Sequence, residues 1–270
     1  MFKKIFLTIF IITSNSYSQD STNSEKSISE NFINDSEIVV SNFLSFYAEP
    51  FNFSSSEWLY TAGIIGGTFF LFSVDQKITN EVGRETTATL NNDFWDIPTR
   101  YGITPYATVF SLSTYAAGLF FKNDDIRITG RLLFESLTIS GVGIILIRYL
   151  AGRQRPYYEK GEWAFEGFET SNEFQSFPSG HTSVAFALST VLAERINNFW
   201  ARLGFYGMAT LTATARVINN QHFTSDVLWG ALLGFGAGMY VINKENKSES
   251  GKIDLSIQPC LNGVRIVYSF

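Results

Sequence analysis

The sequence predicts an all-α fold: a six-helix bundle embedded in a membrane, followed by a small C-terminal β-hairpin. Six apolar stretches lie between residues 58 and 243, separated by short polar connections. Apolar and polar residues do not strictly alternate within these stretches, which favours helices over strands. The chain is 45% hydrophobic and contains 26 Phe residues, a composition that suits a helical core or a lipid-facing surface. After residue 243 the pattern changes to the alternation typical of strands.

The N-terminal segment has the pattern of a secretory signal. Two lysines precede an apolar run from Ile5 to Ile12, and small and polar residues follow up to Ser18. We assign residues 1–18 to a signal peptide cleaved near Ser18; a short buried helix is the alternative. Residues 19–57 are then a polar leader and pre-helical segment. Its first part, Gln19 to Asp35, is rich in Ser, Asn and Glu and is expected to be mobile in the mature chain.

The predicted helical domain covers residues 58–243. Its six apolar stretches are Trp58–Val74, Ile103–Phe121, Leu132–Ile147, Ser183–Leu192, Leu203–Ala215 and Val227–Ile242. Several are shorter than the roughly 20 residues that cross a bilayer, and the third contains Glu135. A soluble or peripheral protein therefore stays open as an alternative to a membrane bundle.

The last segment, residues 244–270, is predicted to be a β-hairpin appendage packed on the helical body. Two runs of alternating apolar and polar residues flank Asn262-Gly263, a pair that favours a hairpin turn. Pro259 limits the pairing of its strand to an edge. Two strands alone cannot close a membrane barrel.

Three polar clusters lie at the ends of apolar stretches, and they contain the only two histidines of the chain. They are Arg148-x6-Arg155-Pro156, Pro178-Ser179-Gly180-His181 and Arg216-x5-His222-x3-Asp226. In a helical protein, side chains that are located at helix ends can point toward a common site. Guanidinium groups, a hydroxyl, helix-end amides and two imidazoles together suit the binding and transfer of a tetrahedral oxyanion.

Each cluster also has a structural interpretation. On a helix, His222 and Asp226 share a face, so the carboxylate can hold one ring nitrogen while the other acts as a nucleophile or base; a capping pair is the alternative. Residues 178–181 start a helix whose free amides attract an anion, although Ser179 can serve simply as an N-cap. Arg148 and Arg155 can bind phosphate or anchor a helix at an interface. Arg153, between them, is left as a spare charge.

Composition excludes several classes of protein. The net charge is −5, so a nucleic-acid surface is not indicated. The single cysteine, Cys260, excludes an internal disulfide framework. Two histidines and one nearby carboxylate are too few ligands for a divalent ion among repelling arginines, so we expect no metal and no cofactor.

The three clusters resemble the signatures of the type 2 phosphatidic acid phosphatase family: Lys-x6-Arg-Pro, Pro-Ser-Gly-His and Ser-Arg-x5-His-x3-Asp. The resemblance covers residues 58–242 in layout, with the motifs in the family's order. Two positions differ, because Arg148 replaces the usual lysine and Ala215 the usual serine. Arg148 keeps the charge with a different reach.

This resemblance implies a metal-independent phosphatase. His222 would attack phosphorus to form a phosphohistidine, Asp226 would orient it, and His181 would protonate the leaving alcohol and later activate water. The phosphoryl oxygens would be held by Arg148, Arg155, Ser179, the Gly180 amide and Arg216.

The family resembled includes lipid phosphatases, soluble acid phosphatases and vanadate-dependent haloperoxidases. The segment from Tyr157 to Phe177 carries five glutamates together with Trp163, Phe165, Phe168 and Phe174, which suggests a lid, with a solvated loop as the alternative. Such a lid suits a lipid phosphate: phosphatidate, phosphatidylglycerol phosphate, isoprenyl diphosphate or a lipid A type. A broad-specificity periplasmic acid phosphatase and a haloperoxidase stay open, and the oligomeric state is not indicated.

The expected location is the cell envelope, in a membrane, with the site facing the periplasm. Lys122, Arg127, Arg195, Arg202 and the C-terminal lysines lie at the opposite ends of the stretches from the motifs, and the positive-inside rule makes that side cytoplasmic. Six crossings after a cleaved leader would place the first motif in the cytoplasm instead. The two arguments conflict, and we favour the periplasmic orientation.

Overall fold

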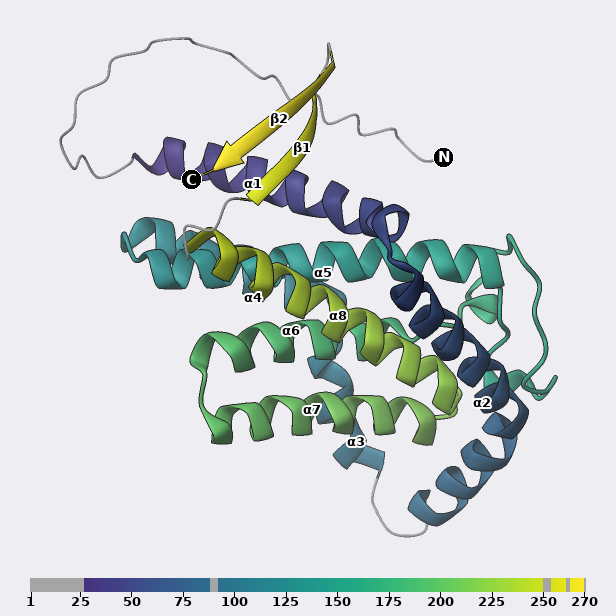
Figure 1. The fold of residues 1–270 in the computed structure, drawn as a ribbon. Helices are drawn as coiled ribbons and strands as arrows, with labels where there is room; N and C mark the ends of the chain where they lie inside the picture. The colour runs from purple at the N-terminus through teal and green to yellow at the C-terminus, as the bar shows by residue number, and fades with distance from the viewer. Residues whose placement is uncertain (1–26, 88–91, 250–253, 261–262, 270) are drawn as a thin grey trace, which may run out of the picture.

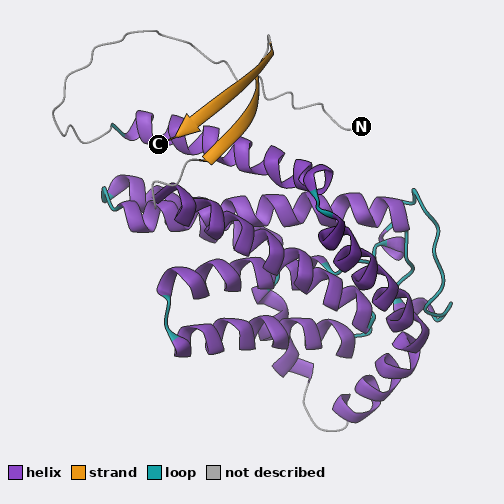
Figure 2. Cartoon of the chain, in the orientation of Figure 1, coloured by secondary structure: helices purple, strands orange, loops and turns teal. Residues whose placement is uncertain are grey.

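The computed structural model describes residues 27–87, 92–249, 254–260 and 263–269. The predicted signal peptide, residues 1–18, lies outside these described residues. In the described part, eight α-helices form the body of the molecule and two strands follow them (Figures 1 and 2).

The helices are α1 (Ile28–Ala48), α2 (Ser55–Thr87), α3 (Asn92–Tyr101), α4 (Thr104–Phe120), α5 (Asp124–Ala151), α6 (Gly180–Ile196), α7 (Phe199–Ile218) and α8 (Thr224–Glu249). Short 3-10 turns occur at Glu49–Asn52, Pro156–Tyr158 and Asn172–Phe174. The six apolar stretches coincide with α2 and with α4 to α8, except that Ile103 and Phe121 flank α4 as its caps. The prediction of helices at these places is confirmed, but their number in the described residues is eight and not six.

The first additional helix, α1, lies in the segment expected to be a polar leader. Ser27 and Glu30 form a capping box at its start. Asp35 is buried, where it accepts a hydrogen bond from the Tyr115 hydroxyl at 2.9 Å and pairs with Arg127 of α5. The expectation of a mobile chain is therefore wrong for residues 28–35, because polar contacts with the bundle hold this helix.

The second additional helix, α3, has only ten residues and contains Pro98. Its Trp95 is buried against Ala215 and Ile218 of α7. A proline inside so short a segment argues against a helix when the sequence is read alone. The burial of Trp95 against α7 offsets the unfavourable effect of Pro98 on this helix.

Helix α6 is the centre of the bundle and packs against α5, α7 and α8. The main core contains Leu132 and Leu133 of α5, Val184 and Val191 of α6, and Val241 of α8, all buried. Glycines allow α8 to approach α6 closely, since a Cβ added at Gly230 would lie 2.3 Å from the Ser179 carbonyl oxygen. The start of α6 is therefore fixed directly by the backbone of α8.

Three helical segments of the described chain are long and apolar enough to cross a membrane. They are Ser55–Val82 of α2, all of α5, and Thr224–Ser248 of α8. The other apolar stretches are too short or too polar by the same measure. The apolar window in α2 is only 11% buried, against 61% in α5, so α2 lies largely on the outside.

Four helix ends meet at one end of the bundle, where α5 and α7 finish and α6 and α8 begin (Figure 1). Helix α2 crosses this same end. Its Thr68 accepts a hydrogen bond from the Trp229 indole of α8 at 2.6 Å, and its Val82 packs near Ile218 of α7. All three predicted motifs lie at this end.

At the C-terminal end, β1 (Asp254–Cys260) and β2 (Gly263–Ser269) pair antiparallel, with Ile257 opposite Ile266. The pair lies beside α1 (Figure 1). Helix α8 continues to Glu249, so residues 244–249 belong to the helix and not to the appendage. Asn262, in the predicted turn, lies outside the described residues.

Candidate active site

The three motifs converge where the four helix ends meet. Arg148 is in the last turn of α5 and Arg216 in the last turn of α7, while Ser179, Gly180 and His181 begin α6. Arg155 follows the end of α5, whose C-cap Gly152 adopts the left-handed conformation with φ 55°. His222 lies in the turn before α8, and Asp226 lies in its first turn. The eight predicted site residues are therefore brought to one end of the bundle.

The start of α6 forms an anion cradle with Arg148. The Arg148 Nε donates to the Pro178 carbonyl at 2.9 Å, which holds the guanidinium beside the helix start. A Cβ at residue 180 would lie 3.1 Å from Arg148 Nη2, so glycine leaves room for this close approach. The first backbone amides of a helix have no acceptor within the helix and favour a bound anion.

Arg155 and Arg216 complete the positive lining. Arg155 donates to the Gln221 side chain at 3.0 Å and to the Asn172 carbonyl at 3.0 Å, so the turn before His222 and the segment after α5 position it. Arg216 is 9% exposed, and its buried Nε makes no hydrogen bond in the described part of the chain. A buried guanidinium donor without a protein acceptor suits an oxyanion ligand.

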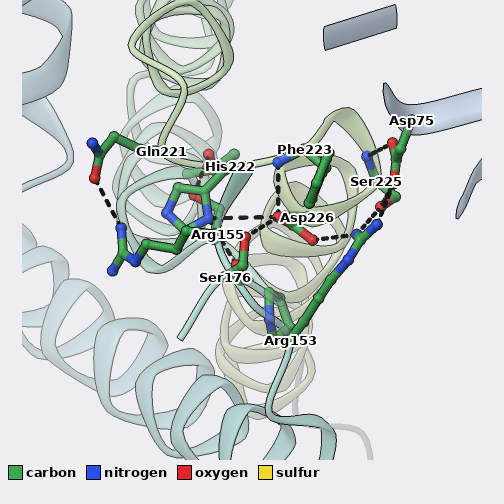
Figure 3. A network of polar contacts seen from close by, with 12 residues as sticks. Asp75, Arg153, Arg155, Ser176, Gln221, His222, Phe223, Ser225 and Asp226 are labelled. Atoms are coloured by element: carbon green, nitrogen blue, oxygen red, sulfur yellow. Dashed lines mark hydrogen bonds and ion pairs between the residues drawn. The ribbon is translucent and has the colours of Figure 1, made fainter. Parts of the chain in front are cut away.

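His222 is buried, and its surroundings decide which ring nitrogen carries the proton. Nδ1 lies 2.7 Å from the Ser176 carbonyl oxygen (Figure 3). A carbonyl oxygen only accepts hydrogen bonds, so Nδ1 is protonated and Nε2 of the neutral ring carries the lone pair. This is the tautomer that a nucleophilic histidine needs.

Asp226 lies farther from His222 than the sequence predicts. Its Oδ2 is 3.8 Å from His222 Nδ1, which is too far for a hydrogen bond, whereas the Ser176 carbonyl makes one at 2.7 Å. The spacing of four residues does not place both on one helix, because α8 begins at Thr224. The expectation that the two residues share a helix face and that the carboxylate holds one ring nitrogen directly is therefore corrected.

Asp226 instead fixes the backbone that surrounds His222. Its Oδ2 accepts from the Ser176 hydroxyl at 2.5 Å and from the Phe223 amide at 2.8 Å. Its backbone carbonyl accepts from the Ser179 amide at 2.9 Å, which also ties the start of α6 to α8. Asp226 thus orients the histidine through its neighbours.

Two further residues belong to this network, although the sequence did not assign them a role. Arg153, described above as a spare charge, is fully buried and donates from Nη1 to Asp226 at 2.7 Å. Its Nη2 donates to Asp75 of α2 at 2.9 Å (Figure 3). The only sequence signal for Asp75 is its position as the first acidic residue after the Trp58–Val74 stretch. Arg153 carries no signal that separates it from its phosphate-binding neighbours.

Both histidines are neutral at pH 7 in this structure. Burial lowers the pKa of His222 to about 4, helped by nearby arginines and opposed by Asp226. Burial and the positive charges of Arg216 and the other site arginines lower the pKa of His181 to about 3. A bound phosphate dianion would offset these positive charges and raise both pKa values.

No group of three or more His, Cys, Asp or Glu side chains that could hold a metal ion occurs within the described ranges. The charges gathered at the site are instead mostly positive. Such a set of charges beside two neutral imidazoles suits an oxyanion ligand.

Fold and site together define a class of protein: an all-helical bundle that gathers two histidines and three arginines around an anion-binding helix start. Residues 129–249 of the chain match the model of the PAP2 superfamily. This match runs from α5 to the end of α8 and so includes all three motifs.

Several relatives carry the name lipid A 1-phosphatase. The protein of Rhizobium johnstonii is 33% identical over 110 residues, which is 40% of this chain and 43% of that protein. The protein of Porphyromonas gingivalis is 42% identical over 65 residues, which is 23% of this chain and 15% of that protein. The chain thus spans less than half the length of these relatives.

Two solved structures are also similar. The crystal structure of Aquifex aeolicus LpxE gives a TM-score of 0.48 at 20% identity and covers 63% of this chain and 95% of that one. A transmembrane PAP2 type phosphatidylglycerolphosphate phosphatase from Bacillus subtilis gives a TM-score of 0.48 at 16% identity, with 69% and 96% covered.

Proposed function

We propose that this protein is a metal-independent membrane phosphatase that removes a phosphate group from a lipid through a phosphohistidine at His222. The observation that carries the proposal is the contact between His222 Nδ1 and the Ser176 carbonyl at 2.7 Å, since it leaves the lone pair on Nε2. Three arginines and the α6 amides provide the counter-charge for the phosphoryl oxygens.

In the first step, His222 Nε2 attacks phosphorus and the bond to the leaving alcohol oxygen breaks. In the substrate complex the phosphate dianion raises the pKa of His181, so that this ring is protonated; it donates the proton to that oxygen, which prevents an alkoxide from leaving. In the second step a water molecule gives a proton to His181 and attacks phosphorus. The N–P bond then breaks, inorganic phosphate leaves, and both histidines return to their starting states. Arg148, Arg155, Arg216, Ser179 and the Gly180 amide hold the three phosphoryl oxygens throughout.

The position of the site supports a lipid substrate. It lies at the end of α5 and the beginning of α8, and both helices are long and apolar enough to cross a membrane. A phosphate-binding site at the end of such helices is level with lipid headgroups. The relatives named lipid A 1-phosphatase make a lipid A phosphate our first choice, before phosphatidate, phosphatidylglycerol phosphate and isoprenyl diphosphate.

We further propose a site facing the periplasm. The opposite end of the bundle carries Arg127, Arg195, Arg202, Lys244 and Lys247, and the positive-inside rule makes that end cytoplasmic. Carbonate washing of isolated membranes tests the membrane part of this proposal. An integral protein stays in the pellet, whereas release into the wash favours the peripheral acid phosphatase.

A phosphate-release panel tests the activity. The full chain in detergent, with EDTA and without vanadate, is offered lipid A, phosphatidate, phosphatidylglycerol phosphate and isoprenyl diphosphate. We expect release from at least one lipid, and His222→Ala should abolish it while the variant stays folded and unfolds cooperatively. Acid quenching should destroy, and alkaline quenching preserve, a protein-bound phosphate in the wild type. Substantial phosphatase activity in His222→Ala would contradict the mechanism.

A further inference from the structure

We propose that Asp75 of α2 is a positioning residue for this reaction, acting on His222 through Arg153, Ser225 and Asp226. The inference rests on the proposed function. Asp75 lies outside residues 129–249, the part of the chain that matches the superfamily model. It is contributed by the helix that crosses the site end of the bundle.

Asp75 is fully buried, and its hydrogen bonds are made with residues at the end of the bundle that holds the candidate site. Its Oδ1 accepts from the Ser225 amide at 2.9 Å, and its Oδ2 accepts from the Ser225 hydroxyl and from Arg153 Nη2 at 2.9 Å. A buried carboxylate is costly unless it is paired and hydrogen-bonded. Asp75 meets this condition only while α8 and Arg153 keep their present positions.

Arg153 uses all five of its N–H donors within the protein. Nε and Nη2 donate to the Glu162 carbonyl at 3.0 and 2.7 Å, Nη1 donates to Ser225 and Asp226, and Nη2 also donates to Asp75. Its guanidinium also lies 4.4 Å from the ring of Phe72 and 4.2 Å from that of Phe223. No donor is left for a phosphate, so Arg153 differs in kind from Arg148, Arg155 and Arg216.

Loss of the Asp75 charge would affect His222 through a series of hydrogen bonds. Asp75 shares the guanidinium of Arg153 with Asp226, and Ser225 bridges the two. Asp226 in turn accepts a hydrogen bond from the Ser176 hydroxyl, and the backbone carbonyl of Ser176 accepts one from His222 Nδ1. Without the Asp75 charge, Arg153 would move toward Asp226 and disturb this chain. A displacement of about 1 Å at the reacting group costs on the order of 100-fold in rate.

The chain offers a matched control on the same helix. Thr68, seven residues before Asp75, accepts a hydrogen bond from Trp229 of α8 at 2.6 Å. This contact also docks α2 on α8 but does not reach Arg153 or Asp226. Thr68→Val therefore removes an α2–α8 hydrogen bond, and Asp75→Asn removes the charge that orders the site.

The experiment compares wild type, Asp75→Asn and Thr68→Val as full chains in detergent, with p-nitrophenyl phosphate as the probe. For Asp75→Asn we expect kcat to fall about 10- to 100-fold with KM within about threefold. The inhibition constant of orthovanadate, which takes the geometry of the transition state, should rise by a similar factor, whereas that of inorganic phosphate should not. Thr68→Val should keep kcat within about twofold.

A merely structural role for Asp75 would give a different result. Equal kcat values in Asp75→Asn and Thr68→Val, or parallel losses of vanadate and phosphate binding, would overturn the assignment and leave the proposed function intact. Wild-type protein without metal-free turnover would overturn both. If Asp75→Asn does not fold, Ser225→Ala replaces it, since that variant removes the bridging hydroxyl and keeps both charges. An unchanged kcat in Ser225→Ala would then overturn the assignment.

Discussion

At the scale of single residues, the arginines of the site separate into two kinds. Arg153 is fully satisfied by protein acceptors, while Arg216 keeps a buried Nε without one in the described chain. Both stand in short motifs with similar neighbours, so their side-chain types cannot distinguish them. The distinction comes from the acceptors that folding brings near, above all Asp75 and the Glu162 carbonyl.

His181 carries a residue-scale prediction. We expect His181→Ala to slow release from a lipid substrate by about 100- to 10,000-fold, because the leaving alcohol then has no proton donor. The loss should be much smaller with p-nitrophenyl phosphate, since a nitrophenolate leaves without a proton. The rate of the first leaving-group release, measured before steady state with both substrates, checks this, because the later step in which His181 activates water is common to them. Equal losses would show that His181 binds phosphate and does not act as the acid.

At the scale of elements, the contact between α6 and α8 sets the shape of the cradle. A Cβ at Gly230 would lie 2.3 Å from the Ser179 carbonyl oxygen, whereas one at Gly236, also on α8, would meet nothing within 4 Å. Gly230 therefore permits the approach that places Asp226 next to the start of α6. Gly236 has no such role.

These two glycines provide a paired test. Gly230→Ala should lower the thermal unfolding midpoint and reduce kcat at least tenfold, because the added methyl group pushes the Ser179 backbone away from α8. Gly236→Ala should leave kcat unchanged and add up to about 1 kcal/mol of stability, since alanine is the better helix former. The thermal unfolding midpoints and kcat values of both variants test this prediction. An unchanged kcat in Gly230→Ala would contradict the prediction, because the start of α6 would then tolerate a shift of α8.

The sequence predicted the elements that apolar patterns define and missed those that polar contacts define. The six apolar stretches coincide with helices, and the three motifs lie together. Helix α1 was missed because its buried positions include Asp35, whose partners lie far along the chain on α4 and α5. The contact of Asp75 with Ser225 is likewise long-range, across 150 residues. No local pattern predicts such pairs.

At the scale of the whole molecule, the bundle separates two polar ends. One end holds the motifs, and the other holds the buried network of Arg131 with Asp35, Glu135 and Glu245, which joins α1, α5 and α8. Helices α5 and α8 connect the two ends and are long enough to cross a membrane. The candidate site and the network around Arg131 are therefore located at opposite ends of these two helices.

The charge of the site makes the stability of the whole protein depend on pH. The folded-state pKa of His222 is about 4 and that of His181 about 3, below the ordinary value of 6.5. Between pH 6.5 and about 4 the unfolded chain therefore binds more protons than the folded protein, so stability falls as the pH falls through this window. A histidine whose pKa is lowered to about 4 contributes a loss on the order of 3 kcal/mol by pH 4.

We therefore expect the thermal unfolding midpoint of the unliganded protein in detergent to fall between pH 6.5 and 4. The double variant His181→Gln, His222→Gln should show a smaller fall, because it cannot take up these protons, and exposed carboxylates contribute equally to both proteins. Inorganic phosphate should reduce the fall in the wild type only, since its negative charge offsets the site arginines and lets the folded histidines bind protons. The same pH dependence in wild type and double variant would show that the two imidazoles are not held neutral by the site.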